Sequence, residues 1–157
     1  MSPDDFEHLV AGVTGQIAGR ALDEALEHWL NASWPHGSTT FNALEHACRL
    51  GVEQGWLCNR EAGGIRYGRI VKPTPRTHAF SVDVVLMEDL VGPHHVHPNG
   101  EIDLIMPISE QARFDGHPAG WRVYGPGSAH CPTVSNGQAL VLYLLPQGAI
   151  EFTKANA

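Results

Sequence analysis

Three histidines and two carboxylates are crowded into GPHHVHPNGEID, residues 92 to 103, directly before an apolar run. His95 and His97 are two residues apart and would share one face of a strand, as would Glu101 and Asp103. The intervening Pro-Asn-Gly predicts a turn that folds the second pair back over the first. Neutral imidazole and carboxylate are common ligands of first-row divalent metals. The stretch therefore predicts a metal site or an acid–base site.

A further ligand is available downstream, where His130 follows a Pro-Gly turn at the head of another predicted strand. We expect His95, His97, Glu101 and His130 to converge on one divalent metal with an open coordination position. The ligand set leaves zinc, iron, manganese and nickel open, and we expect no organic cofactor. If no metal binds, the histidines would act as general acid and base. Asp103 would orient a histidine or shuttle a proton, or it would merely close a polar turn.

The elements that position these residues differ between the two parts of the chain. Residues 1–60 show helical spacing of apolar side chains, with a capping start at Ser2 and Pro3. The glycines of this part are expected to bend or split the first helix: Gly12, Gly15 and Gly19. A second helix is predicted from Ser38 or Thr39 to Gly55. We expect this segment to pack on the rest of the chain as scaffold.

Residues 61–157 carry short runs rich in Val, Ile, Tyr and Phe, broken by Gly, Pro and Asn. Such runs predict an antiparallel sandwich or barrel, so the expected fold is mainly β with N-terminal helices in a single compact unit. The predicted strands are 65–71, 78–87, 101–108, 120–124, 129–134, 139–145 and 150–152.

Composition narrows the class of partner. The formal net charge of −7 disfavours nucleic acid and anionic membranes as partners, and no run of 18 apolar residues occurs. The acidic N-terminus is unlike a secretory signal, which favours a cytoplasmic protein. The three cysteines form no CxxC pair and are expected to be reduced and packed. We expect a small-molecule ligand, with a homodimer as an open alternative to a monomer.

Both histidine segments resemble the cupin superfamily. Its first motif, G-x5-H-x-H-x3,4-E-x6-G, is matched by the HVHPNGE stretch, and its second, G-x5-P-x-G-x2-H-x3-N, by GWRVYGPGSAH. The ligand positions are intact, but the turns depart from the pattern. The first glycine stands three residues before His95, Ile108 replaces the closing glycine, Pro126 directly precedes Gly127, and Val134 replaces the asparagine. The resemblance implies a divergent cupin-like barrel of jelly-roll type over residues 65–152.

A narrower resemblance covers nearly the whole chain. The strings GWLCNREAGGIRYGRI, HHVHPNGEIDLIMPI, GHPAGWRVYGPGSAHCPTV and ALVLYLLPQGAIEF are similar to the 4-hydroxylaminobenzoate lyase family of bacterial nitroarene catabolism. The resemblance implies conversion of 4-hydroxylaminobenzoate to 3,4-dihydroxybenzoate and ammonia. Two alternatives stay open because a ligand set does not choose a reaction: a metal-dependent dioxygenase or isomerase acting on a phenolic or sugar-like acid, and a non-catalytic small-molecule-binding cupin.

A benzoate-type substrate needs a cation, most naturally a guanidinium that binds the carboxylate through two hydrogen bonds. In a regular strand Arg66 and Arg69 lie on opposite faces, and Arg69 shares its face with Ile65 and Tyr67. We therefore expect Arg69 to bind the substrate carboxylate with Tyr67 beside the ring. Tyr124 is a further candidate for the substrate site. Arg66 and Arg122 are the next candidates for the anchor, and exposed strand arginines are the alternative.

Overall fold

Three α-helices precede ten strands in the computed structural model, which describes residues 1–153. The helices are α1 (Pro3–Ile17), α2 (Glu24–Ser33) and α3 (Thr39–Gln54), and a 3₁₀ turn, η1, spans Pro75–Thr77. The strands are β1 (Arg60–Ala62), β2 (Ile65–Val71), β3 (Phe80–Val91), β4 (His95–His97), β5 (Glu101–Pro107), β6 (Arg113–Phe114), β7 (Gly120–Tyr124), β8 (Ser128–His130), β9 (Thr133–Pro146) and β10 (Glu151–Phe152).

Each α-helix begins at a side chain that caps a backbone N–H. Ser2, Asp23 and Ser38 accept the hydrogen bonds that start α1, α2 and α3. Gly55 ends α3 in the left-handed conformation, at φ 85°. The first helical stretch is split where Gly19 takes φ 77°, as one of the three glycines was expected to do. Gly12 and Gly15 do not split the helix, because both lie inside the hydrogen-bonded run of α1.

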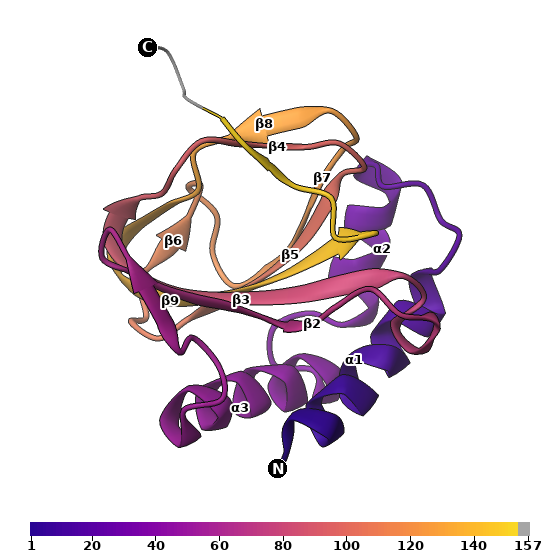
Figure 1. Ribbon diagram of the computed structural model, residues 1–157, viewed down its shortest axis with the longest axis horizontal. Coiled ribbons are helices and arrows are strands. Elements are labelled where there is room, and N and C mark those ends of the chain that lie inside the picture. The colour runs from indigo at the N-terminus through magenta and orange to yellow at the C-terminus, as the bar shows by residue number, and fades with distance from the viewer. Residues whose placement is uncertain (154–157) are drawn as a thin grey trace.

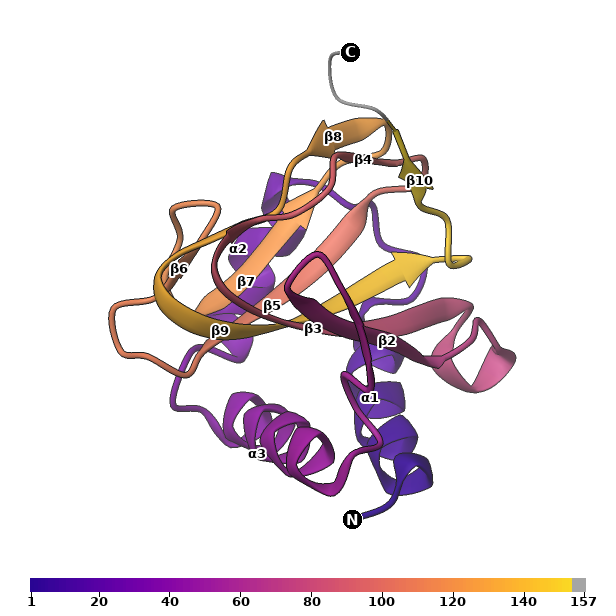
Figure 2. The ribbon, with the colours of Figure 1, turned by 60° about the vertical axis from the view of Figure 1, so that its left-hand side comes forward.

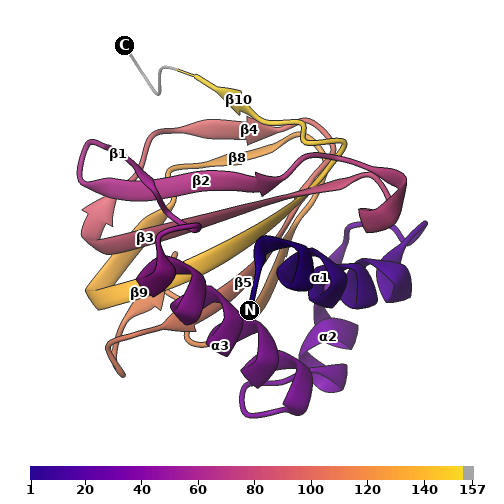
Figure 3. The ribbon, with the colours of Figure 1, turned by 60° about the horizontal axis from the view of Figure 1, so that its bottom comes forward.

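Two antiparallel sheets form the β part of the protein. The larger sheet has seven strands in the order β1-β2-β3-β9-β5-β7, with β6 paired to β9. The smaller sheet has three strands in the order β10-β4-β8. Figure 1 shows the smaller sheet above the larger one, and Figure 2 shows α1 and α3 beneath the larger sheet's opposite face. Viewed from the helix side, in Figure 3, the layers are helices, larger sheet and smaller sheet.

One hydrophobic core joins the helices to the larger sheet. Phe6, Leu30 and Phe41 from the helices pack in the same cluster as Leu104 and Leu142 from β5 and β9. All five side chains are at most 1% exposed. Since the helices bury this face of the sheet, the opposite face is left to line the space between the two sheets.

The prediction of a mainly β, antiparallel chain with N-terminal helices is confirmed. Strand pairing does not join the two sheets within residues 1–153, so those residues form two facing sheets and not one closed barrel. The last four residues of the expected segment 61–157 lie outside the described residues. No helix in the described part of the chain is long and apolar enough to cross a membrane.

Several strand boundaries differ from expectation. His78 does not begin a strand, because it has φ 54° and β3 starts at Phe80. Residues 129–134 are not one strand but the end of β8 and the start of β9. The Ser-Asn-Gly-Gln stretch expected to separate two strands lies inside β9, where Asn136 and Gly137 have positive φ and β9 still pairs with β3 on both sides.

Candidate metal centre and cavity

The four expected ligands lie together between the two sheets. His95 and His97 come from β4, His130 from β8 and Glu101 from the start of β5. One ligand atom from each residue lies within 4.8 Å of the others. The Glu101 carboxylate is central, since its oxygens lie 3.2 Å from His97 Nε2, 3.6 Å from His130 Nε2 and 3.7 Å from His95 Nε2.

Two local features bring these side chains together. In the smaller sheet His95 lies directly opposite His130, so the two imidazoles share a face, and their Nε2 atoms are 3.1 Å apart. The turn before Glu101 depends on Gly100, which has φ 86°. A Cβ atom at Gly100 would lie 2.8 Å from the Tyr124 carbonyl oxygen. This turn therefore needs glycine both for its dihedral angle and for the close approach of β7.

Hydrogen bonds fix two of the imidazoles with Nε2 directed toward Glu101. His97 Nδ1 lies 3.0 Å from Ser128 Oγ, and Ser128 Oγ donates to the Gly125 carbonyl at 2.6 Å. Because that hydroxyl has one proton, it accepts the Nδ1–H of His97. His130 Nδ1 donates to Asp115 Oδ2 at 2.6 Å. When these imidazoles are neutral, the free lone pair of each is on Nε2, which is how outer hydrogen bonds orient metal-binding histidines.

The residues fit a divalent metal on the chemistry of their donors. His97 Nε2 and both oxygens of Glu101 are fully buried and have no hydrogen-bond partner among the described residues. Burial alone would raise the pKa of the Glu101 carboxyl, but the histidines hold it well below its usual range. A buried carboxylate with three imidazole nitrogens directed at it is a suitable set for a first-row cation.

Asp115 supports the cluster from outside, and the sequence prediction did not include it. It lies in a turn at φ 50°, and its carboxylate accepts from His130, from the Tyr124 hydroxyl at 2.6 Å and from the Thr133 backbone at 2.9 Å. Burial lowers the pKa of His130, but the hydrogen bond to Asp115 and the nearby Glu101 carboxylate outweigh it and raise that pKa to about 9. The Asp-Gly pair at 115–116 was the available signal, although it indicates only a turn.

Asp103 is fully buried beside the cluster. Both of its carboxylate oxygens lack a hydrogen-bond partner among the described residues. It shares its strand face with Glu101, and it lies directly opposite Tyr143 of β9. Burial, reinforced by the negative charge of Glu101, raises the pKa of Asp103 well above its usual range. The structure thus places Asp103 next to the ligands with a carboxyl that favours the protonated form.

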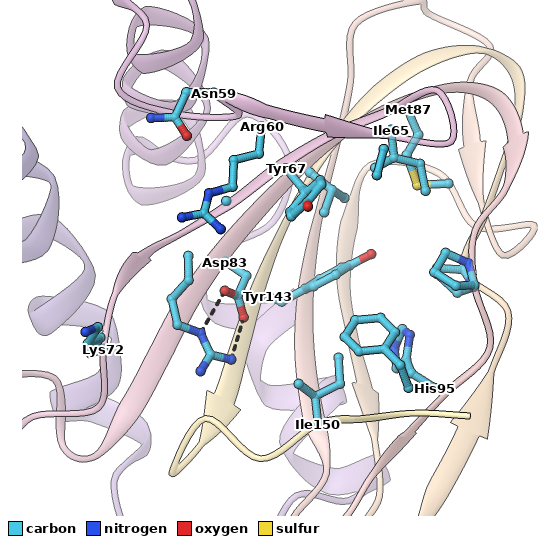
Figure 4. A pocket seen from close by; sticks show the side chains of 17 residues that line it. Asn59, Arg60, Ile65, Tyr67, Lys72, Asp83, Met87, His95, Tyr143 and Ile150 are labelled. Atoms are coloured by element: carbon cyan, nitrogen blue, oxygen red, sulfur yellow. Dashed lines mark hydrogen bonds and ion pairs between the residues drawn. The ribbon is translucent and has the colours of Figure 1, made fainter. Parts of the chain in front are cut away.

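A cavity of about 820 Å³ opens beside the cluster, and His95 forms part of its wall. Figure 4 shows its labelled lining residues, among them Arg60, Tyr67, Asp83 and Tyr143. Tyr143 is 5% exposed and lines the cavity from β9. Tyr143 therefore contributes an aromatic ring to the wall of this cavity.

The expected substrate residues are placed differently from one another. Tyr67 and Arg69 both line the cavity, whereas Arg66 and Tyr124 are absent from its wall. The Arg69 guanidinium is already bonded to Asp83, with Nε at 2.9 Å from Oδ1 and Nη2 at 3.1 Å from Oδ2. Tyr124 contacts the ligand cluster instead, with its ring centroid 4.6 Å from that of His130. Arg122, the remaining candidate for the carboxylate anchor, pairs with Glu27 at 3.1 Å and is also absent from the cavity wall.

Comparison with known proteins covers nearly the whole chain. Residues 8–152 match the family model described as 4-hydroxylaminobenzoate lyase (PnbB). The chain is 31% identical over 160 residues to the 4-hydroxylaminobenzoate lyase of Nocardioides sp. (strain LMS-CY), covering 96% of this chain and 95% of that protein. It is 29% identical over 166 residues to the enzyme of the same name from Pseudomonas putida, covering 95% and 94%.

Among solved structures, the chain is similar to an RmlC-like cupin protein from Ralstonia eutropha JMP134. The TM-score is 0.45 and the identity 11%, over 59% of this chain and 62% of that one. Family membership rests instead on the match that spans residues 8–152 and on the two full-length relatives. The chain belongs to the 4-hydroxylaminobenzoate lyase family.

Proposed function

We propose that this protein is a carbon–nitrogen lyase that converts 4-hydroxylaminobenzoate and water to 3,4-dihydroxybenzoate and ammonia. The observation that carries the proposal is the convergence of His95, His97, Glu101 and His130 at the wall of a cavity, in a chain of this family. The cavity is large enough for a small aromatic acid, since ligand pockets of about 300–1,000 Å³ are usual.

The reaction balances as two additions of water and one loss. The N–O bond breaks, and hydroxide leaves with the electron pair and takes up a proton. Water adds to the electron-poor ring at the carbon next to the one that bears the nitrogen, and the added oxygen loses a proton. A second water hydrolyses the resulting imine, which releases ammonia, and the ring regains aromaticity as the catechol. The protein must therefore supply a proton at the departing oxygen and accept one from the attacking water.

A divalent metal held by His95, His97, Glu101 and His130 would supply Lewis-acid chemistry or lower the pKa of a bound water. The chain's own groups have separate tasks in the proposal. Asp115 orients His130 through the 2.6 Å bond, and Tyr124 orients Asp115. Without a metal, His130 would carry the proton that the departing hydroxide needs, because its pKa is raised to about 9. Its Nε2 would be the donating atom, since Nδ1 is held by Asp115.

The wall of the cavity supports the positioning of the ring. Tyr67 and Tyr143 present aromatic rings from β2 and β9, and we propose that the substrate ring lies against them. Of the two roles expected for Asp103, the proposal keeps the proton shuttle, because neither of its oxygens bonds to a histidine among the described residues. None of these tasks needs an organic cofactor.

The test is turnover of 4-hydroxylaminobenzoate by purified protein without oxygen, together with metal analysis. We expect 3,4-dihydroxybenzoate and ammonia in equal amounts, and about one divalent metal per chain. Chelation should remove the activity, and adding back the metal should restore it. An absolute requirement for oxygen would contradict the lyase and favour a dioxygenase. Full activity after complete removal of metal would contradict a catalytic role for the metal. The histidines would then be the proposed general acid and base.

A further inference from the structure

The charges around the cavity are unbalanced in favour of an anionic ligand. Three cationic side chains line it, Arg60, Arg69 and Lys72, against a single carboxylate, Asp83. The protein as a whole has a net charge of −7, so the excess of cations here is local. A local excess of positive charge attracts an anionic ligand and raises its encounter rate.

Arg69 is not free to bind that anion. Asp83 receives both Nε and Nη2 of its guanidinium, and Nη2 also donates to the Gly148 carbonyl at 3.2 Å. If a substrate carboxylate displaced Asp83 from the Arg69 guanidinium, Asp83 would lose its ion-pair partner, although its side chain is only 17% exposed. A buried carboxylate that loses its ion pair is costly. Arg69 therefore serves to neutralise Asp83 in the wall.

Arg60 lies on the same side of the β1–β2 hairpin as the cavity. It is directly opposite Tyr67 in the antiparallel pair, and directly opposite residues point to the same face. The next pair, Glu61 with Arg66, points to the other face, and neither residue lines the cavity. In the described part of the chain Arg60 has no ion pair and no side-chain hydrogen bond. Figure 4 shows its guanidinium within the group of lining side chains, on the side of Tyr67 and Asp83.

The opposite part of the wall holds His95 of the ligand cluster. In Figure 4, Tyr67 and Tyr143 appear between Arg60 and His95. A para-substituted aromatic acid has its anionic and reactive groups at opposite ends of one ring. Such a molecule could lie along this aromatic wall with its carboxylate at the cation and its other end at the cluster.

We propose that Arg60 binds the carboxylate of the substrate and thereby makes the enzyme prefer anionic arylhydroxylamines over neutral ones. This inference rests on the proposed function. It assigns the specificity to β1, a strand of three residues at the edge of the larger sheet. A planar guanidinium with an unoccupied pair of donors matches a carboxylate geometrically, and a lysine ammonium such as that of Lys72 does not.

The experiment compares Arg60→Met with the wild type on 4-hydroxylaminobenzoate and on phenylhydroxylamine, which lacks the carboxylate. A charge-assisted hydrogen bond contributes about 1.5–3 kcal/mol, so kcat/KM for the anionic substrate should fall about 10- to 100-fold. The neutral substrate should change by less than about threefold, within the scatter expected of a surface substitution. Arg60→Lys should recover part of the loss, because it keeps the charge and loses the planar pair of donors.

Arg66→Met is the matched control, since it removes the same charge from the neighbouring strand on the other face. It should leave the preference between the two substrates unchanged. Equal losses on both substrates in Arg60→Met, or a loss of preference in Lys72→Met but not in Arg60→Met, would overturn the inference.

A binding measurement separates this inference from the proposed reaction. Calorimetry with 4-hydroxybenzoate and with phenol needs no turnover. Arg60→Met should weaken 4-hydroxybenzoate about 10- to 100-fold and leave phenol unchanged, for the reason given above. If the wild type binds the two ligands equally, Arg60 does not recognise the carboxylate. If the wild type discriminates and Arg60→Met loses that discrimination, but the wild type fails to convert 4-hydroxylaminobenzoate, the reaction is wrong and the recognition by Arg60 stands.

Discussion

Strands β3, β5 and β9 present two faces with different chemistry. Toward the helices they place only apolar side chains in the main core: Val82, Val84, Leu86, Ile102, Leu104, Met106, Leu140, Leu142 and Leu144. Toward the smaller sheet the same strands place Asp83, Glu101, Asp103 and Tyr143. Both faces are buried, so exposure does not distinguish them. The difference teaches that apolar packing on the helix-facing side stabilises the sheet. The face toward the smaller sheet is then free to carry polar groups that lack hydrogen-bond partners.

Glu101→Gln tests the polar face and should have the largest effect on activity. The amide keeps the shape of the side chain but removes the charge that faces His95, His97 and His130. We expect turnover to fall at least about 100-fold, the low end of what a positioned acid–base group contributes. Bound metal should fall with it. The variant should stay folded without metal but unfold at a lower temperature than the metal-free wild type, because the lowered pKa of Glu101 means that its charge stabilises the folded state. A folded variant with wild-type turnover would contradict a role for this carboxylate.

Leu142→Ala tests the apolar face. Leu142 is 1% exposed and lies directly opposite Val84 and Leu104 in the sheet. Truncating it leaves a cavity, so the free energy of unfolding should fall by about 2–5 kcal/mol in urea titrations. The folded fraction should keep kcat/KM within about threefold of the wild type, since the side chain points away from the ligand cluster. A loss of turnover larger than the loss of folded protein would show that the two faces are coupled.

The pH dependence of stability sharpens the comparison on the polar face. The pKa of His130 is about 9 in the folded protein and near 6.5 when unfolded. Its contribution to the free energy of unfolding is therefore complete below about pH 6.5 and is lost as the pH rises through about 9. The metal-free protein should lose on the order of 3 kcal/mol of stability over this range.

Asp115→Asn is the control for that dependence, because it removes the first bond that raises the pKa of His130. Thermal unfolding of this variant, measured from pH 6 to pH 10 without metal, should depend less on pH. With metal bound, stability should instead increase as the pH rises, since the metal competes with the proton and binds more tightly at higher pH. An unchanged slope in the variant would exclude the His130–Asp115 pair as its source.

Three of the four clustered side chains could be predicted together because their signal is local, whereas His130, 35 positions from His95, was indicated by its own Pro-Gly turn and by the resemblance to the cupin motif. Only Val96 separates His95 from His97, and a turn with a required glycine returns the chain to Glu101. The helix starts were also readable, since Ser2 and Ser38 cap the backbone within three residues. In each case the deciding interaction lies within a few positions of the residue that signals it.

Features set by the register of distant strands could not be predicted in this way. The bond between Arg69 and Asp83 exists because the two residues are directly opposite in β2 and β3, 14 positions apart. Asp115 meets His130 across 15 positions, and nothing near it in sequence indicates a partner. The continuous β9 was missed because Asn136 and Gly137 read as a turn, whereas pairing with β3 holds both halves in one strand.

The origin of the four ligands has a mechanical consequence. Three of them belong to the short strands of the smaller sheet, and the fourth belongs to the larger sheet. A cation held by all four is thus a cross-link between the two sheets, in a place where strand pairing provides none within residues 1–153. Because binding stabilises only the arrangement in which all four ligands meet, cation affinity and the docking of the smaller sheet become one linked equilibrium. The backbone amides of β4 and β8 would then exchange their hydrogens more slowly when the cation is bound, while those of α1 and α3 would report little of it.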